Sequence, residues 1–214
     1  HDFDIFKHSL KVMQKIVQNP EFNNLNNSDK KIMLLASLLH DITKKEGFTD
    51  PTHAIEGGFD AFFISKKFNL ADDEEIKLYN LIKNHEWLGF VNKSKNNKEL
   101  TEKLRSTAYD LRHDNIFDMS LMFTHADLKA VKTDDSFHDR PYGTGRTDFN
   151  GETLSFGERA DLYADKIKKL IEELKPSQPI LPVTKIPKAS IIEKAITTVK
   201  QDGSTNIKGD YKDK

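Results

Sequence analysis

The segment that most constrains the fold is residues 30–42, which read KKIMLLASLLHDI. Between its opening lysines and its closing His40-Asp41 pair, nearly every residue is apolar, at a spacing that fits a helix. A helix that is apolar on nearly every side belongs in the interior of a domain. We therefore predict a domain built around this buried helix, with Ser28 and Asp29 as candidates for its N-cap.

Helical patterns also dominate the rest of the chain, and no segment carries a confident strand pattern. We therefore predict an all-α fold, a compact helical bundle. The Gly57-Gly58 pair falls inside one predicted helix, at a cost of about 1 kcal/mol each relative to alanine, which indicates close packing against the central helix. Besides the central helix, the predicted helices cover residues 4–17, 53–68, 74–90, 99–112, 116–131 and 156–174.

Two segments depart from the helical pattern. Residues 133–156 contain a proline and several glycines, and we predict a long irregular loop of the kind that is often functional. After Lys175 the sequence becomes PSQPILPVTKIP, which is typical of a linker. We predict one domain over residues 1–175 and an appendage over residues 176–214. The appendage is a proline-interrupted linker with a short helical or disordered tail, and it could lead to another domain.

Composition excludes several classes of function. The formal net charge is -1, so no overall attraction to nucleic acid or to an anionic membrane is implied. The chain has no cysteine, which excludes disulfides, thiol nucleophiles and cysteine-ligated metals. No apolar run approaches the roughly 18–20 residues that cross a bilayer, and nothing at the start reads as a signal peptide. We expect a cytoplasmic protein with no membrane partner.

Histidine and aspartate recur at positions that packing alone does not require. The His40-Asp41 pair closes the most apolar segment, where burial of an unpaired carboxylate is costly. A divalent cation removes that cost, because it binds imidazole nitrogen and carboxylate oxygen together. Taken singly, each of the other positions is more often a core or capping residue than a ligand. Together they favour a metal site, since each lies at the edge of the apolar face of a different predicted helix: His8, His53, His85 and Asp127.

The order and local sequence of these residues resemble the HD superfamily of metal-dependent phosphohydrolases. LASLLHDITK (residues 35–44) resembles the central helix of that family, and residues 53–89 resemble the following histidine, small-residue pair and closing histidine. FTHADLKAV (residues 123–131) is similar to the last ligand-bearing helix. The spacing is closest to the HD domains of bacterial tRNA nucleotidyltransferases and of uridylyl-removing enzymes. The resemblance runs from His8 to about Val131 and implies an HD-type helical bundle.

The resemblance also implies the ligand set and the reaction. One divalent metal ion would be held by four side chains: His8, His40, Asp41 and Asp127. A second ion would be held by His53 and His85, with Asp41 as the bridge; with a single ion, those two histidines would contact phosphate or transfer protons. Mn, Fe, Mg, Zn, Ni and Co are not distinguished. The catalytic residues would then be Asp41, Lys44, His53 and His85.

Three basic residues are candidates for contacts with a phosphate. Lys44 lies one helical turn after His40, so its ammonium could reach a phosphate oxygen, although lysines at helix ends are common without a role. Arg140 and Arg146 lie in the predicted loop and could clamp phosphate, although loop arginines without a role are commoner.

The interpretation that these features favour is an enzyme that hydrolyses a phosphoester, either a phosphodiester or a nucleotide phosphate. Its partner would be a small phosphorylated or nucleotide substrate, or a nucleotidylated macromolecule. The alternatives are a regulatory or ligand-sensing HD module with little turnover and, as a rarer use of such ligands, a di-iron oxygenase. The sequence does not indicate the oligomeric state.

Overall fold

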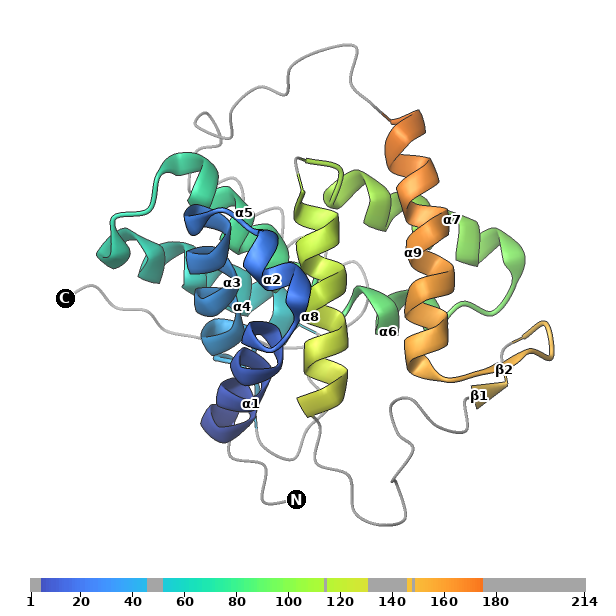
Figure 1. Ribbon diagram of the computed structural model, residues 1–214. Coiled ribbons are helices and arrows are strands. Elements are labelled where there is room, and N and C mark those ends of the chain that lie inside the picture. The colour runs from blue at the N-terminus through green and yellow to red at the C-terminus, as the bar shows by residue number, and fades with distance from the viewer. Residues whose placement is uncertain (1–4, 46–51, 114, 131–145, 148, 175–214) are drawn as a thin grey trace, which may run out of the picture. The chain divides into compact units, whose positions relative to one another are not determined.

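The computed structural model describes residues 5–45, 52–113, 115–130, 146–147 and 149–174. Within these residues the predicted all-α fold is confirmed, and the two described strands are only two residues long. The predicted appendage and most of the predicted loop lie outside the described residues. The elements, in chain order, are α1 (Ile5–Val17), α2 (Pro20–Asn24), α3 (Asn27–Leu39), α4 (His53–Ser65), the 3-10 turn η1 (Lys66–Phe68), α5 (Asp72–Lys83), α6 (Trp87–Asn92), α7 (Asn97–Asp110), α8 (Ile116–Ala130), β1 (Arg146–Thr147), β2 (Thr153–Leu154) and α9 (Phe156–Glu173) (Figure 1).

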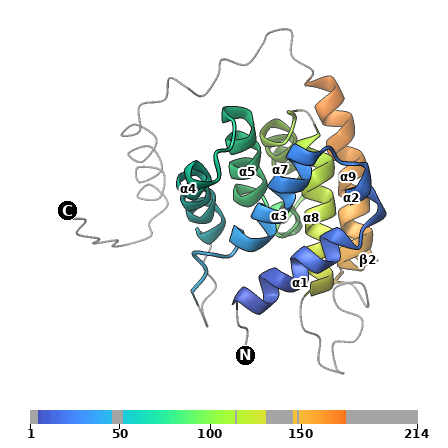
Figure 2. The same ribbon diagram turned by 60° about the vertical axis from the view of Figure 1, so that its left-hand side comes forward.

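The apolar segment singled out in the sequence forms α3, which contacts α1, α4, α5 and α8 (Figure 2). Ile32, Met33 and Ala36 are fully buried on this helix. The predicted burial of this helix is confirmed at these three positions, whereas Leu38 is 36% exposed. The neighbouring helices therefore cover only part of its circumference.

Both ends of α3 differ from the prediction. The N-cap is Asn26, whose side chain accepts a hydrogen bond of 2.8 Å from the backbone N–H of Asp29. Asp29 is buried instead and forms an ion pair of 3.0 Å with Lys77 of α5. The helix ends at Leu39, so the His40-Asp41 pair lies in the turn that follows rather than inside the helix.

The prediction of one continuous helix over residues 74–90 is wrong, because the chain forms two helices with a turn between them. α5 ends at Lys83, α6 begins at Trp87, and His85 lies in the turn between them. The backbone N–H of His85 donates to the carbonyl of Ile82, over 3.2 Å, which closes this turn. His85 therefore lies just beyond a helix end, as His40 does.

Close backbone approach explains the glycine pair of α4, as predicted, but only Gly57 lies against the end of the central helix, whereas Gly58 lies against α5. A Cβ atom at Gly57 would lie 3.2 Å from the carbonyl oxygen of His40, and one at Gly58 would lie 3.3 Å from the carbonyl oxygen of Tyr79. Contacts this short are tighter than real side chains normally make. The two glycines thus let α4 pack directly against the turn after α3 and against α5.

The C-terminal part of the described chain is a short hairpin followed by α9, which contacts α7 and α8. The strands β1 and β2 pair antiparallel, with Thr147 opposite Thr153. Ser155 caps α9 and shares a reciprocal capping box with Glu158. Among the described helices, none has the length and apolar character that crossing a bilayer requires.

Candidate metal centre

The structure brings all six predicted metal ligands together from separate parts of the chain. They come from α1, from the turn after α3, from the first turn of α4, from the turn between α5 and α6, and from α8. Five are buried, with at most 6% of each residue exposed, and the side chain of the sixth is 28% exposed. In chain order the five buried residues are His8, His40, Asp41, His53 and His85, and the sixth residue is Asp127.

The first group of ligand atoms surrounds Oδ2 of Asp41. His40 Nε2 lies 3.5 Å and His8 Nε2 lies 4.0 Å from this oxygen. Asp127 Oδ1 accepts a hydrogen bond of 2.8 Å from His8 Nε2 and lies 3.9 Å from His40 Nε2. Ligand atoms on one ion lie about 3–4 Å apart, because each is about 2.1 Å from the metal. The ligand atoms of His8, His40 and Asp41 lie close enough together to hold one ion, and Asp127 borders this group through His8. Binding of an ion would replace the proton on His8 Nε2.

The second group surrounds the other oxygen of the same carboxylate. His53 Nε2 and His85 Nε2 lie 3.4 Å and 3.5 Å from Asp41 Oδ1 and 3.3 Å from one another. These distances also fall in the range expected for ligands of one ion. Asp41 therefore stands between two groups, each of which could hold a divalent metal ion.

Backbone carbonyls fix the orientation of two of the imidazoles. His40 Nδ1 lies 3.0 Å from the carbonyl oxygen of Ser37, and His85 Nδ1 lies 2.8 Å from that of Ile82. A carbonyl oxygen can only accept, so Nδ1 carries the proton in both rings and the lone pair of each neutral ring is on Nε2. Histidine ligands of metals are commonly oriented in this way. Both Nε2 atoms face the Asp41 carboxylate.

Buried polar atoms without hydrogen bonds give a further test of whether these residues could hold a metal ion. His40 Nε2 and Asp41 Oδ1 are both shielded from solvent, and the described residues offer neither atom a hydrogen bond. Leaving such atoms unpaired costs about 1–3 kcal/mol each. A cation coordinated by both atoms would remove this cost, so the donor set fits a divalent metal.

The protonation states at the centre also favour cation binding. Burial lowers the pKa of His40 from 6.5 to about 4, against the raising influence of Asp127, so its ring is neutral at neutral pH. Burial alone would raise the pKa of Asp41, but its contacts with His53 and His85 bring that pKa well below the ordinary range. The centre thus presents a neutral imidazole and an ionised carboxylate, the forms that bind metal.

Lys44 lies beside the centre, where its ammonium forms an ion pair of 2.9 Å with Asp41 Oδ2. Burial would lower the pKa of Lys44, but the Asp41 carboxylate outweighs this and raises it. The lysine side chain is 42% exposed, so it connects the buried carboxylate with the solvent side.

The structure does not describe the side chains of the two predicted loop arginines. Arg140 lies outside the described residues, and Arg146 is in β1 with a side chain that is also outside the description.

One acidic residue reaches the centre without having been predicted as a ligand. Glu86 Oε1 lies 3.9 Å from His53 Nε2, and the Glu86 side chain is 51% exposed. The sequence places Glu86 directly after His85. That position did not suggest a ligand because the segment was predicted as a continuous helix, in which adjacent side chains point about 100° apart.

Comparisons with known proteins do not assign the chain to a family. No family model, curated protein or solved structure matches it. What the structure itself shows is a helical fold with a buried histidine and aspartate cluster that could bind metal.

Proposed function

We propose that this chain is a metal-dependent phosphohydrolase of the HD type, acting on a phosphodiester or a nucleotide phosphate. The observation that carries the proposal is the position of Asp41, which faces one pair of imidazoles with each carboxylate oxygen: His8 and His40, and His53 and His85. A shared carboxylate between two ligand groups is suited to a pair of ions. The resemblance of the ligand order to HD enzymes supports hydrolysis over other uses of such a centre.

Each ligand group has its own role in this proposal. Bound divalent ions would lower the pKa of water and offset the charge on the attacking and leaving phosphate oxygens. Asp41 would hold both ions, with His53 and His85 on one side; the ligands on the other side are His8, His40 and Asp127. If the second group binds its ion only weakly, His53 and His85 can still transfer a proton, since their Nε2 atoms are 3.3 Å apart.

Lys44 would bind the substrate phosphate. Its ammonium is held next to the centre by Asp41 and its side chain is partly exposed, so a phosphate oxygen arriving from solvent would meet it. A metal ion on Asp41 would compete with Lys44 for Oδ2 and free the ammonium for the phosphate. A lysine acts here as a point charge, which stabilises developing negative charge without fixing the orientation of the leaving group.

The substrate class follows from what surrounds the centre. Neither the cavity beside α6 and α9 nor the one beside α2 and α8 is lined by any of the six ligands. We expect a small nucleotide or a nucleotidylated macromolecule as substrate, with loose selectivity for the base, because neither of these cavities could hold a base next to the ligands.

Metal content and hydrolysis measured on the same samples test the proposal. The purified chain is expected to contain a transition metal and to hydrolyse bis-p-nitrophenyl phosphate or a nucleotide ester, with loss of activity in chelator. Asp41→Asn should lose metal and activity together, whereas Asp165→Asn, an exposed aspartate of α9, should keep both. A metal-loaded protein that is inert toward all these esters but binds a nucleotide tightly would refute the enzyme and favour the regulatory module.

A further inference from the structure

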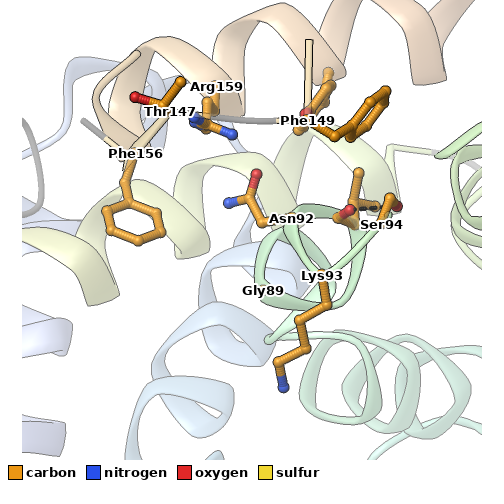
Figure 3. Close-up of a pocket in the computed structure, with 10 residues that line it drawn as sticks. Gly89, Asn92, Lys93, Ser94, Thr147, Phe149, Phe156 and Arg159 are labelled. Atoms are coloured by element: carbon orange, nitrogen blue, oxygen red, sulfur yellow. Dashed lines mark hydrogen bonds between the residues drawn. The ribbon is translucent and has the colours of Figure 1, made fainter. Parts of the chain in front are cut away.

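A cavity of about 380 Å³ lies between the C-terminal end of α6, the hairpin and the first turns of α9. Its wall includes three aromatic side chains, Phe149, Phe156 and Tyr163. Figure 3 shows Phe149 and Phe156 on opposite flanks of the polar side chains at its middle. A volume of this size matches known small-molecule pockets, which are mostly apolar with a few placed polar groups.

The first polar group is Arg159, which is only 4% exposed. Its guanidinium donates to two backbone carbonyls, those of Leu154 over 3.3 Å and Glu152 over 3.4 Å. No carboxylate of the described residues lies within ion-pair distance of it. Burial of a cation without a counter-charge is costly, because backbone dipoles replace only part of its hydration. The wall of this cavity therefore contains a buried positive charge that has no anionic partner among the described residues.

The second polar group is Asn92, the last residue of α6. Both polar atoms of its carboxamide are shielded from solvent, and neither has a hydrogen-bond partner within the part of the chain that the structure describes. In Figure 3 this carboxamide and the Arg159 guanidinium point toward one another at the middle of the cavity. Hydrogen-bond donors of Arg159 and of Asn92 thus face the same part of the cavity.

We propose that this cavity binds a small organic oxyanion, a phosphonate, phosphate or carboxylate carried on a flat ring. Arg159 donates to the anionic oxygens, because a guanidinium matches the geometry of both phosphate and carboxylate. The Asn92 amide donates to the same group, and the ring of the ligand packs between Phe149 and Phe156. This site is separate from the metal centre and does not depend on the centre being catalytic.

Calorimetric titration of the full chain with two ligands that cannot be hydrolysed, phenylphosphonate and benzoate, tests the site. At least one is expected to bind with a Kd below about 1 mM, and neutral benzyl alcohol is expected to bind at least about tenfold more weakly. The stronger of the two anions identifies whether phosphate or carboxylate is preferred. Arg159→Gln and Asn92→Leu should each weaken binding about tenfold or more.

Two further variants keep the test decisive. Phe149 is 37% exposed, so Phe149→Ala should fold even if Arg159→Gln does not, and it should also weaken binding. Asp41→Asn removes the shared ligand of the metal centre and should leave binding unchanged. The proposal is overturned if neither anion binds at concentrations up to about 10 mM, or if benzyl alcohol binds equally well. It is also overturned if Asp41→Asn abolishes binding while Asn92→Leu and Phe149→Ala preserve it.

Discussion

Acid should destabilise the metal-free protein through His40, at a pH where carboxylates are still ionised. Burial holds the pKa of this imidazole at about 4 in the folded chain, against 6.5 when it is exposed. Between these pH values the imidazole is protonated in the unfolded chain and neutral in the folded chain. The free energy of unfolding therefore falls as the pH is lowered through 6.5 toward 4. The difference corresponds to about 3 kcal/mol, because one pKa unit is worth about 1.4 kcal/mol.

Urea unfolding in chelator at a series of pH values between 7 and 4 measures this loss, and His40→Asn isolates its source. Asparagine can keep the donor to the Ser37 carbonyl but has no titrating ring, so the variant should lose about 3 kcal/mol less than the wild type over this range. A saturating divalent metal should add stability at pH 7, about 2.7 kcal/mol at a hundred times its Kd, and this gain should shrink in acid. Equal pH dependence in the two proteins would refute the assignment to His40.

Three further predictions concern individual side chains at or near the centre. Lys44→Ala should lower the rate of ester hydrolysis at least about tenfold without reducing metal content, and a rate equal to that of the wild type would remove Lys44 from the mechanism. His85→Ala should halve a two-ion metal content measured by elemental analysis and abolish most activity, and unchanged content would contradict the second ion. Gly57→Ala should weaken metal binding, because its methyl group would press on the His40 carbonyl. The matched control is Gly89→Ala, whose methyl group would meet no atom within 4 Å and should raise the free energy of unfolding by up to about 1 kcal/mol.

Local pattern predicted the helices and the presence of polar residues at the edges of their apolar faces, whereas the division of the ligands into two groups came only from the resemblance to the HD superfamily. Each ligand follows or borders an apolar stripe, so burying the stripes draws the polar residues at their edges together. The turn at His85 could not be predicted, since the segment NLIKNHEWLG carries neither proline nor an interior glycine at the turn itself. The turn places the Nε2 atom of His85 3.5 Å from Asp41, a tertiary contact that local pattern does not reveal.

Arg159 shows a signal that the sequence did contain. It lies four residues before Tyr163 and eight before Ile167, both of which are buried, so helical periodicity places all three on one face of α9. An arginine on an apolar face is unusual and indicates either a partner or a ligand. What the sequence could not show is that the hairpin after β1 would supply two backbone carbonyls but no carboxylate within the described residues.

The balance of charge at the metal centre accounts for why such a cluster suits phosphate chemistry. Two carboxylates, Asp41 and Asp127, face one ammonium, Lys44, so with neutral imidazoles these three groups sum to one negative charge. Glu86 adds another at the exposed edge. A phosphate dianion would be repelled by this arrangement, and Lys44 would remain paired with Asp41. One divalent ion brings the sum of Asp41, Asp127 and Lys44 to one positive charge, which Glu86 cancels, and two ions leave two positive charges with Glu86 included. Metal binding therefore both satisfies the buried ligand atoms and reverses the sign of the field that a phosphate meets.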